Sequence, residues 1–501
     1  MSTLTTISPE VLSRYEPVIG LEVHVQLLTQ SKIFCSCSTR FGDPPNQNTC
    51  PVCLGLPGAL PVLNRDAVTM AMKAALALDC TINPRSRFAR KNYFYPDLPK
   101  GYQISQYDEP LAEHGWVDIE AEGVRKRVGV TRVHLEEDAG KSLHEGFSDS
   151  DENTYIDLNR SGVPLIEIVS EPDLRSPEEA YDYLTRLKIL MLYLDVSDCN
   201  MEEGSLRVDA NVSVRKKGTS EFGTKTEVKN LNSFRFLQKA LAYEVGRQIE
   251  VLESGGEIQQ ETRLFDSREQ KTYGMRSKEF AHDYRYFPEP DLLPLVITDE
   301  WKEEVRRSLP ELPGARESRF VRKYDLPAQD AALLAQSRTM ADYFEETVKR
   351  CSEPKLAANW ILNDLTFLLQ ESHTEFTENP IPPENLAELI SLIARGEISG
   401  KMGKEILAEM FRSLDDAADH FDPGMSRPAR VMAKLGIEQI SDAERITAVV
   451  REIMAANPKQ TEQYRKGKTA TLGWFVGQVM KATRGQANPQ MVQEVLKKEL
   501  S

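Results

Sequence analysis

The sequence predicts an α+β fold in which a β-rich N-terminal region is followed by an all-α region. Residues up to about 290 contain short segments that alternate polar and apolar residues with a period of two, the pattern of half-buried strands. After Pro294 the apolar spacing becomes helical, and Pro and Gly interrupt it at short intervals. With 501 residues the chain is too long for one compact core, so we expect about two to four domains.

The N-terminal region is predicted to hold both strands and helices. The predicted strands are 20–27, 128–135, 164–169, 206–214 and 224–231. One helix is predicted from Pro177 to about Asp195, because acidic residues occupy its first turn. Another begins after the cap residue Ser233 and ends at about Ser254, before two consecutive glycines.

The C-terminal region is predicted to be helical and to divide near residue 400. Breaks are expected at 310–313, 380–383 and 422–424, where Pro or Gly recurs. Residues 426–501 contain 13 Lys and Arg against 7 Asp and Glu, whereas the whole chain has a net charge of −15. The overall charge argues against one large basic nucleic-acid surface. The basic tail favours a local contact with a polyanion, although a solvated helical surface explains it equally well.

Composition limits the class of protein further. A hydrophobic content of 40% and a charged content of 28% are typical of soluble globular proteins. The sequence has no run of about 18 or more apolar residues, so we expect no membrane-spanning helix. Residues 1–17 lack the basic patch and apolar core of a secretory signal, and an organelle transit peptide is poorly supported. We interpret this segment as a flexible extension and expect a cytoplasmic protein.

Four of the seven cysteines form two close pairs on one short loop. They are Cys35, Cys37, Cys50 and Cys53, and we call residues 35–53 the four-cysteine loop. Tetrahedral zinc takes four thiolates, and a close pair supplies two ligands from one turn. Disulfides are not expected without an export signal, and free thiols remain the other alternative. We predict a structural zinc ion, and we interpret Cys80, Cys199 and Cys351 as isolated buried thiols.

Carboxylates and a histidine recur on one face of the predicted strands. Glu22, His24 and Gln26 share one face of strand 20–27. Strand 128–135 runs into three consecutive acids at 136–138, and alternation does not decide between Glu136 and Glu137. Glu167 lies among large apolar residues, where an unpaired carboxylate would be costly.

The last polar face belongs to strand 206–214, where Arg207, Asp209, Asn211 and Ser213 point the same way. Together these faces predict a sheet with a polar site on its concave side. Acids with a histidine suit Mg²⁺ or Mn²⁺, although solvent-exposed faces of a one-sided sheet would show the same alternation.

Short catalytic patterns do not identify the chemistry of this face. We find no defensible Ser-His-Asp pattern, and the segments 140–142 and 467–469 lack the earlier glycine of a phosphate-binding loop. A cradle of metal and carboxylates could support phosphoryl transfer or metal-assisted hydrolysis.

Longer runs of sequence are more specific. They are IGLEVH (19–24), RKNYFYPD (90–97), YQISQ (102–106), HLEEDAGK (134–141), DLNR (157–160), PLIEIVSEPD (164–173), MEEGS (201–205), DYRYFPEP (283–290), GQVMK (477–481) and GQANP (485–489). These runs resemble the B subunit of the aspartyl/glutamyl-tRNA amidotransferases. The resemblance covers residues 15 to 501, and no motif is missing.

The resemblance implies a two-step reaction in a heterotrimer. ATP phosphorylates the side chain of Glu-tRNA(Gln) or Asp-tRNA(Asn), and ammonia then displaces the phosphate. The amidase, or A subunit, releases the ammonia from glutamine, and a small C subunit holds the assembly together. The implied domains are a flexible extension (1–15), a β-rich cradle domain (16–294) with the zinc loop (35–53), a helical domain (295–405) and an all-α tail domain that binds tRNA (406–501).

The resemblance also implies roles for particular residues. The metal ligands are His24, Glu137 and Glu167, and Glu22 lies beside them; these four form the expected catalytic set. Further candidates for the ATP and substrate pocket, or for the ammonia path and acceptor-end contacts, are Glu203, Asp209, Lys91, Tyr93, Tyr95 and Lys100. The expected zinc ligands are the four cysteines of the four-cysteine loop. The candidates for tRNA contacts are Lys466, Lys468, Lys481 and Arg484.

Two other classes of function remain open at this point. A stand-alone metal-dependent hydrolase or nuclease would use the same acidic face without ATP or glutamine. A non-catalytic tRNA adaptor would use the zinc loop and tail only for structure and binding. An assay of the chain with and without its partners separates these classes.

Overall fold

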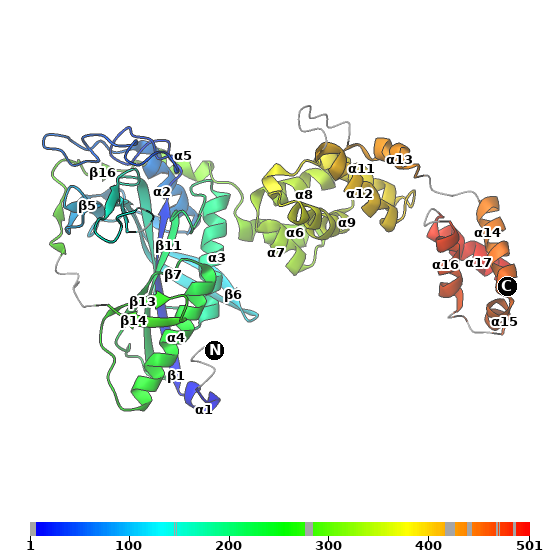
Figure 1. The fold of residues 1–501 in the computed structure, drawn as a ribbon, viewed down its shortest axis with the longest axis horizontal. Coiled ribbons are helices and arrows are strands. Elements are labelled where there is room, and N and C mark those ends of the chain that lie inside the picture. The colour runs from blue at the N-terminus through cyan, green and yellow to red at the C-terminus, as the bar shows by residue number, and fades with distance from the viewer. Residues whose placement is uncertain are drawn as a thin grey trace. The chain divides into compact units, whose positions relative to one another are not determined.

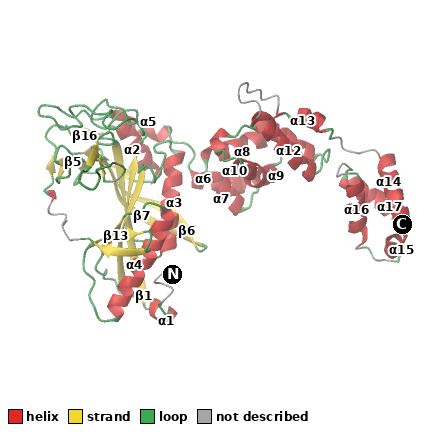
Figure 2. Ribbon diagram, viewed as in Figure 1, coloured by secondary structure: helices red, strands yellow, loops and turns green. Residues whose placement is uncertain are grey.

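The structure is a computed structural model that describes residues 7–144, 146, 148–275, 284–415, 426–437, 443–466, 469, 471–483 and 487–500. The chain divides into two compact units, Met1–Leu312 and Pro313–Ser501. Strands gather in the first unit, whereas the described part of the second consists of helices and loops (Figures 1 and 2). The α+β fold class is therefore confirmed. In the part of the chain that the structure describes, no helix has the length and apolar character needed to cross a membrane.

A nine-stranded sheet forms the centre of the first unit, in the order β14-β13-β12-β11-β1-β10-β7-β6-β2. The strands are β1 (Tyr15–Gln26), β2 (Thr81–Ile82), β6 (Ala112–Ala121), β7 (Val124–Glu137), β10 (Pro164–Ser170), β11 (Leu206–Lys216), β12 (Thr226–Lys229), β13 (Thr262–Asp266) and β14 (Lys271–Gly274). All pairs are antiparallel except β12 with β13. All five predicted strands are present. The outer strands β2, β6, β13 and β14 were not predicted.

Shorter strands build smaller sheets beside the large one. These strands are β3 (Arg85–Ser86), β4 (Phe88–Asn92), β5 (Tyr102–Gln106), β8 (Lys141–Leu143), β9 (Tyr155–Asp157), β15 (Phe287–Pro288) and β16 (Leu295–Val296). The order β15-β4-β5 forms a three-stranded sheet, and β8 pairs with β9. The chain that follows Glu137 in β7 therefore enters a region of short strands and loops.

Helices cover the apolar face of the large sheet. They are α2 (Arg65–Ala77), α3 (Pro177–Tyr193) and α4 (Phe234–Glu253). Two further helices of this unit are α1 (Pro9–Leu12), which precedes β1, and α5 (Asp299–Arg307), which packs against α2. Leu21, Val23 and Val25 of β1 belong to one buried core with side chains of α2, α3 and α4. Ser233 caps α4, as predicted, by accepting a hydrogen bond from the backbone N–H of Phe236 at 3.1 Å. Since side chains alternate along β1, its polar residues must face away from these helices.

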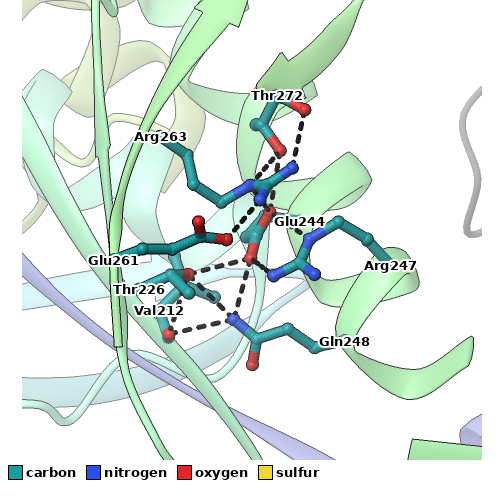
Figure 3. Close-up of polar contacts among 8 residues, drawn as sticks. All are labelled: Val212, Thr226, Glu244, Arg247, Gln248, Glu261, Arg263 and Thr272. Atoms are coloured by element: carbon teal, nitrogen blue, oxygen red, sulfur yellow. Dashed lines mark hydrogen bonds and ion pairs between the residues drawn. The ribbon is translucent and has the colours of Figure 1, made fainter. Parts of the chain in front are cut away.

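A buried carboxylate joins α4 to the edge of the sheet. Glu244 is fully buried, and its carboxylate lies at the middle of a polar cluster (Figure 3). The side chains that contact it are Thr226 of β12 (2.8 Å), Thr272 of β14 (2.8 Å), Arg263 of β13 (3.3 Å), and Arg247 (2.6 Å) and Gln248 (3.0 Å) of α4. Burial opposes ionisation, but these donors hold the pKa of Glu244 below its ordinary value. Through Glu244, the cluster links the short strand β12 to α4 and to the neighbouring strands β13 and β14.

Two separate cores organise the second unit. The helices are α6 (Pro313–Tyr324), α7 (Ala328–Ala335), α8 (Arg338–Cys351), α9 (Pro354–Asn359), a π-helix (Trp360–Leu365), α10 (Thr366–Glu371), a 3₁₀ turn (Phe376–Glu378), α11 (Pro383–Ala394), α12 (Gly400–Asp415), α13 (Pro428–Leu435), α14 (Ala443–Ala456), α15 (Pro458–Arg465), α16 (Thr471–Ala482) and α17 (Pro489–Leu500). Buried side chains from Phe320 to Ile437 form one core, and those from Ile446 to Leu500 form the other. The break expected at 422–424 lies outside the described residues. The domain boundaries drawn from the sequence stay predictions.

An ion cluster between α6 and α8 makes the stability of the second unit depend on pH. Glu345 accepts two hydrogen bonds from Arg319, at 2.6 and 2.8 Å, and one from Arg316 at 2.8 Å. These contacts lower the pKa of Glu345 to about 2. Because the pKa is depressed in the folded state, the stabilisation is complete above about pH 4.5 and is lost as pH falls toward 2.

We therefore expect Glu345→Gln to destabilise the second unit at pH 6.5 by on the order of 1–2 kcal/mol, after allowance for solvent screening. The difference from wild type should shrink when both proteins are compared at pH 3.5. Hydrogen exchange of the α6 and α8 amides measures both values. A difference that stayed constant between the two pH values would show that the ion cluster does not cause the effect.

Candidate active site

One row of polar side chains crosses the centre of the large sheet. The antiparallel registers place His24 of β1 opposite Arg207 of β11 on one side and Glu167 of β10 on the other. Glu167 in turn lies opposite His134 of β7. Directly opposed residues have Cβ atoms about 5 Å apart, so these four side chains are neighbours. The row lies on the face opposite the core helices.

Two carboxylates and two imidazoles converge within this row. His24 Nε2 lies 3.4 Å from Glu167 Oε2 and 3.7 Å from Glu136 Oε1. His134 Nε2 lies 3.3 Å from Glu167 Oε2 and 3.8 Å from Glu136 Oε2. Ligand atoms of His24, Glu136 and Glu167 all lie within 4.8 Å of one another, which is close enough for one ion to contact all three. One imidazole nitrogen and two carboxylates form a ligand set that suits Mg²⁺ or Mn²⁺.

Glu137, which the resemblance assigned to the metal, has different partners in the structure. Its carboxylate pairs with Lys100 Nζ and accepts a hydrogen bond from the backbone N–H of Ile104 at 2.8 Å. It therefore faces the small sheet that contains β5. The structure instead groups Glu136 with His24 and Glu167. Metal binding by Glu137 stays a prediction.

The charges of this cluster shift its pKa values strongly. Burial alone would lower the pKa of His134, but Glu167 and Glu136 raise it to about 9. Burial alone would raise the pKa of Glu167, yet His134 and His24 hold it well below the ordinary value. Glu22 behaves differently, because burial and the nearby charge of Glu167 raise its pKa. The site thus combines ionised carboxylates with one acid that holds its proton more readily.

A second polar group continues from this cluster toward the edge of the sheet. The amide of Asn211 donates a hydrogen bond to Glu22 at 2.8 Å. Lys229 Nζ lies 3.0 Å from Asp209 Oδ2 and 3.0 Å from Glu227 Oε1. Asp209, a predicted pocket residue, lies directly opposite Glu22 in the β1–β11 register. Glu203, the other acid predicted for this pocket, lies in the turn before β11, with its backbone N–H 3.4 Å from the side chain of Asn200.

A third group surrounds the buried carboxylate of Asp138. It accepts a hydrogen bond from Gln26 at 2.7 Å and lies 3.0 Å from Arg207 and 3.8 Å from Arg160. The sequence analysis did not identify His134, Lys229 or Arg160 as site residues. The two-residue alternation that selected His24 applies equally to His134 and Lys229, so the signal was present in the sequence.

The predicted aromatic and basic residues lie together next to the acids. Tyr93 and Tyr95 pack edge to face with ring centroids 5.8 Å apart. Lys91 Nζ lies 4.9 Å from the ring centroid of Tyr284. Burial and the charges of Glu136 and Glu137 raise the pKa of Tyr93. Lys100 joins this group to Glu137.

The four-cysteine loop brings its thiols together. Ligand atoms of all four cysteines lie within 4.8 Å of one another, and the Cys50 and Cys53 sulfurs are 3.8 Å apart. Hydrogen bonds from Cys35 and from the backbone of Cys50, with the charge of Lys32, lower the pKa of Cys53 to about 4. The same contacts raise the pKa of Cys35, and burial raises that of Cys37, so the acidity is concentrated on Cys53. The convergence of four sulfur ligands fits an ion held by tetrahedral coordination. All seven cysteines are free; Cys80 and Cys199 are buried, whereas Cys351 is only half-buried.

The predicted tRNA-contact residues of the tail are only partly described. Lys466 is exposed and pairs with Glu462 at 2.7 Å, and Lys481 is exposed on α16. Lys468 and Arg484 lie outside the described residues. Contact of these four residues with tRNA stays a prediction.

Comparison with known proteins places both units in one family. Residues 17–303 match the GatB/GatE catalytic domain, and residues 342–500 match the GatB domain. The chain is 56% identical over 490 residues to the B subunit of the aspartyl/glutamyl-tRNA(Asn/Gln) amidotransferase of Carboxydothermus hydrogenoformans, a match that covers 98% of this chain and 100% of the relative. It is 53% identical to the B subunit of Thermoanaerobacter pseudethanolicus (97% and 100% covered) and 54% identical to that of Geotalea daltonii (97% and 99% covered). The chain belongs to the B-subunit family of the aspartyl/glutamyl-tRNA(Asn/Gln) amidotransferases.

Proposed function

We propose that this chain phosphorylates the side-chain carboxylate of Glu-tRNA(Gln), Asp-tRNA(Asn) or both with ATP, and that ammonia then displaces the phosphate to form the amide. The proposal rests on one observation: the side chains of His24, Glu136 and Glu167 converge on one face of the sheet, where they are largely buried. Phosphoryl transfer needs mainly positioning and charge neutralisation, and this ligand set can hold the ion that helps with both. The names of the relatives, which are tRNA amidotransferase subunits, favour the same reaction.

The side chains of the site would divide this work. His24, Glu167 and one carboxylate of the pair Glu136/Glu137 hold the divalent ion. The bound ion would neutralise charge on the phosphates of ATP and polarise the transferred group. Lys229, in the second polar group, would orient an anionic substrate. The raised pKa of Glu22 makes it our candidate for the group that accepts the proton lost when ammonia becomes the amide.

Other parts of the chain take supporting roles in this proposal. Lys91, Tyr93, Tyr95 and Lys100 line the approach of ammonia or contact the acceptor end of tRNA. The four-cysteine loop holds a structural zinc ion. The basic residues of the tail contact the tRNA backbone, and such contacts would make binding sensitive to salt.

The proposed assembly is a cytoplasmic heterotrimer in which this chain joins the amidase, or A subunit, with the small C subunit. Nothing in the sequence resembles the Ser-rich amidase that would release ammonia from glutamine, so we assign that step to the amidase subunit. The chain by itself should not hydrolyse glutamine, and glutaminase activity from the isolated chain would contradict this division.

The test uses the chain co-purified with its partner subunits. The complex is supplied with ATP, Mg²⁺ and glutamine labelled in its amide nitrogen, and with Glu-tRNA(Gln) and Asp-tRNA(Asn) in parallel reactions. We expect labelled Gln-tRNA or Asn-tRNA together with stoichiometric ADP. Cleavage of the tRNA or its ester without ATP would instead identify a hydrolase. Tight tRNA binding without turnover on either substrate would identify an adaptor.

A further inference from the structure

Lys32 is a fully buried lysine next to the four-cysteine loop. Its side chain has 0% exposure, and Nζ donates hydrogen bonds to the backbone carbonyls of Asn48 (2.6 Å) and Leu158 (3.2 Å). Both acceptors are uncharged. In the described parts of the chain, no carboxylate lies within 4.0 Å of this ammonium group. A buried ammonium without a counter-charge costs several kcal/mol, so a negative charge is needed nearby.

The four-cysteine loop adjoins Lys32 and can supply such a charge. The backbone N–H of Lys32 donates to the carbonyl of Cys37 at 3.0 Å, and Nζ reaches Asn48, two residues before Cys50. A Cβ added at Gly162 would lie 3.5 Å from Lys32 Cδ and 3.9 Å from Cys53 Cβ, so the lysine stem and Cys53 flank the same glycine. A divalent ion bound by four thiolates has a net charge of −2. The positive charge of Lys32 and the negative charge of such a centre would stabilise each other.

We propose that Lys32 is the counter-charge of a metal–tetrathiolate centre formed by Cys35, Cys37, Cys50 and Cys53, and that it joins this centre to the segment 156–163. The inference rests on the zinc ion of the proposed function. It adds a positioning residue whose effect on metal retention can be measured separately from amidation.

The segment 156–163 connects the four-cysteine loop with the acidic cluster. Toward the loop, the side chain of Asn46 donates to the carbonyl of Ile156 at 2.9 Å, and the backbone N–H of Asn48 donates to the side-chain oxygen of Asn159 at 2.8 Å. Toward the cluster, the N–H of Gly162 donates to the carbonyl of Asp138 at 2.8 Å, and the N–H of Asp138 donates to the carbonyl of Val163 at 2.9 Å. Loss of the metal centre should therefore loosen the chain that directly follows Glu136 and Glu137.

The experiment compares zinc retention in the full complex. Lys32→Met preserves the length and apolar stem of the side chain and removes its charge; Lys217→Met removes an exposed lysine of the same unit and serves as the control. Wild type and Lys217→Met should retain one zinc ion per chain. Lys32→Met should release zinc to a chromogenic chelator at least about tenfold faster, as is typical for loss of a group that supports a metal site. Amides of Asp138 and Gly162 should also exchange hydrogen faster in Lys32→Met.

A compensating variant distinguishes charge from packing. Cys37→His reduces the negative charge of the centre by one and keeps a zinc-binding donor set. We expect Cys37→His to slow zinc release in the Lys32→Met background. If Lys32→Met does not fold, Lys32→Gln keeps a donor without the charge, and the same comparison applies.

The outcomes separate the inference from the proposed zinc. If wild type retains zinc and the neutral variants release it at the wild-type rate, the role of Lys32 is wrong and the zinc assignment stands. Faster release that Cys37→His does not slow would assign Lys32 a packing role and would also overturn the inference. A wild-type complex that takes up no zinc would overturn both.

Discussion

Glu167→Gln is expected to reduce ATP-dependent amidation of tRNA by at least about a hundredfold, because removal of a metal ligand should cost more than the 10–100-fold typical of outer-sphere partners. Glu167 lies between His24 and His134, 3.4 and 3.3 Å from their Nε2 atoms, and its carboxylate is ionised. Glutamine has the same shape but lacks the charge. The measurement is single-turnover formation of amidated tRNA by the complex, with tRNA affinity determined in parallel. tRNA affinity should not change.

Glu171→Gln is the matched control, because Glu171 directly follows β10 and accepts a hydrogen bond from Thr131 at 2.8 Å, outside the cluster. It should amidate like wild type. Retention of wild-type amidation by Glu167→Gln would overturn the assignment of the site.

The same assay decides between the two neighbouring carboxylates. The geometry predicts that Glu136→Gln loses activity as Glu167→Gln does, because Glu136 contacts both imidazoles. Near-normal amidation by Glu136→Gln, combined with loss in Glu137→Gln, would place the ion on the ligands that the resemblance implied. Loss in both would mean that Glu137 acts through its pairing with Lys100 or joins the ligands during the reaction.

Glu244→Ala is expected to lower the free energy of unfolding of the first unit by about 3–5 kcal/mol, the typical cost of removing one partner from a buried charged cluster. The substitution leaves Arg263, Thr226 and Thr272 without their shared acceptor (Figure 3). Strand β12 has only three paired residues with β11 and three with β13, so it depends on this side-chain anchoring.

Hydrogen exchange of the α4 and β12–β14 amides, measured at increasing urea concentrations, gives the unfolding free energy of the first unit. Because these amides belong to the first unit, the measurement is not affected by unfolding of the second unit. Glu250→Ala removes an exposed glutamate of the same helix and should change the unfolding free energy by less than about 0.5 kcal/mol. An equally small change for Glu244→Ala would show that the cluster is dispensable. Since Lys229 and Glu227 lie on the same strand as Thr226, a large change would also disturb the second polar group of the site.

Local patterns in the sequence were sufficient for the central strands of the large sheet and for the helices α3 and α4. Alternation with period two predicted β1, β7 and β11, because side chains on a strand point to opposite faces wherever the strand pairs. Ser233 predicted the start of α4, because a cap acts within its own first turn. The close spacing of the four cysteines predicted their convergence for the same reason. The long runs of sequence were specific enough to indicate the family by themselves.

Only the tertiary structure decided which of these residues meet. Glu136 and Glu137 are adjacent at a strand end, so alternation could not choose between them, whereas the β7–β10 register turns Glu136 toward His24. Lys32 and Glu244 gave no signal, because a charged residue in the sequence shows its burial only through its distant partners. Lys32 reaches Leu158, and Glu244 reaches Thr272. Periodicity, caps and cysteine spacing depend on interactions between residues close in the chain, whereas register and burial depend on contacts between segments that only folding brings together.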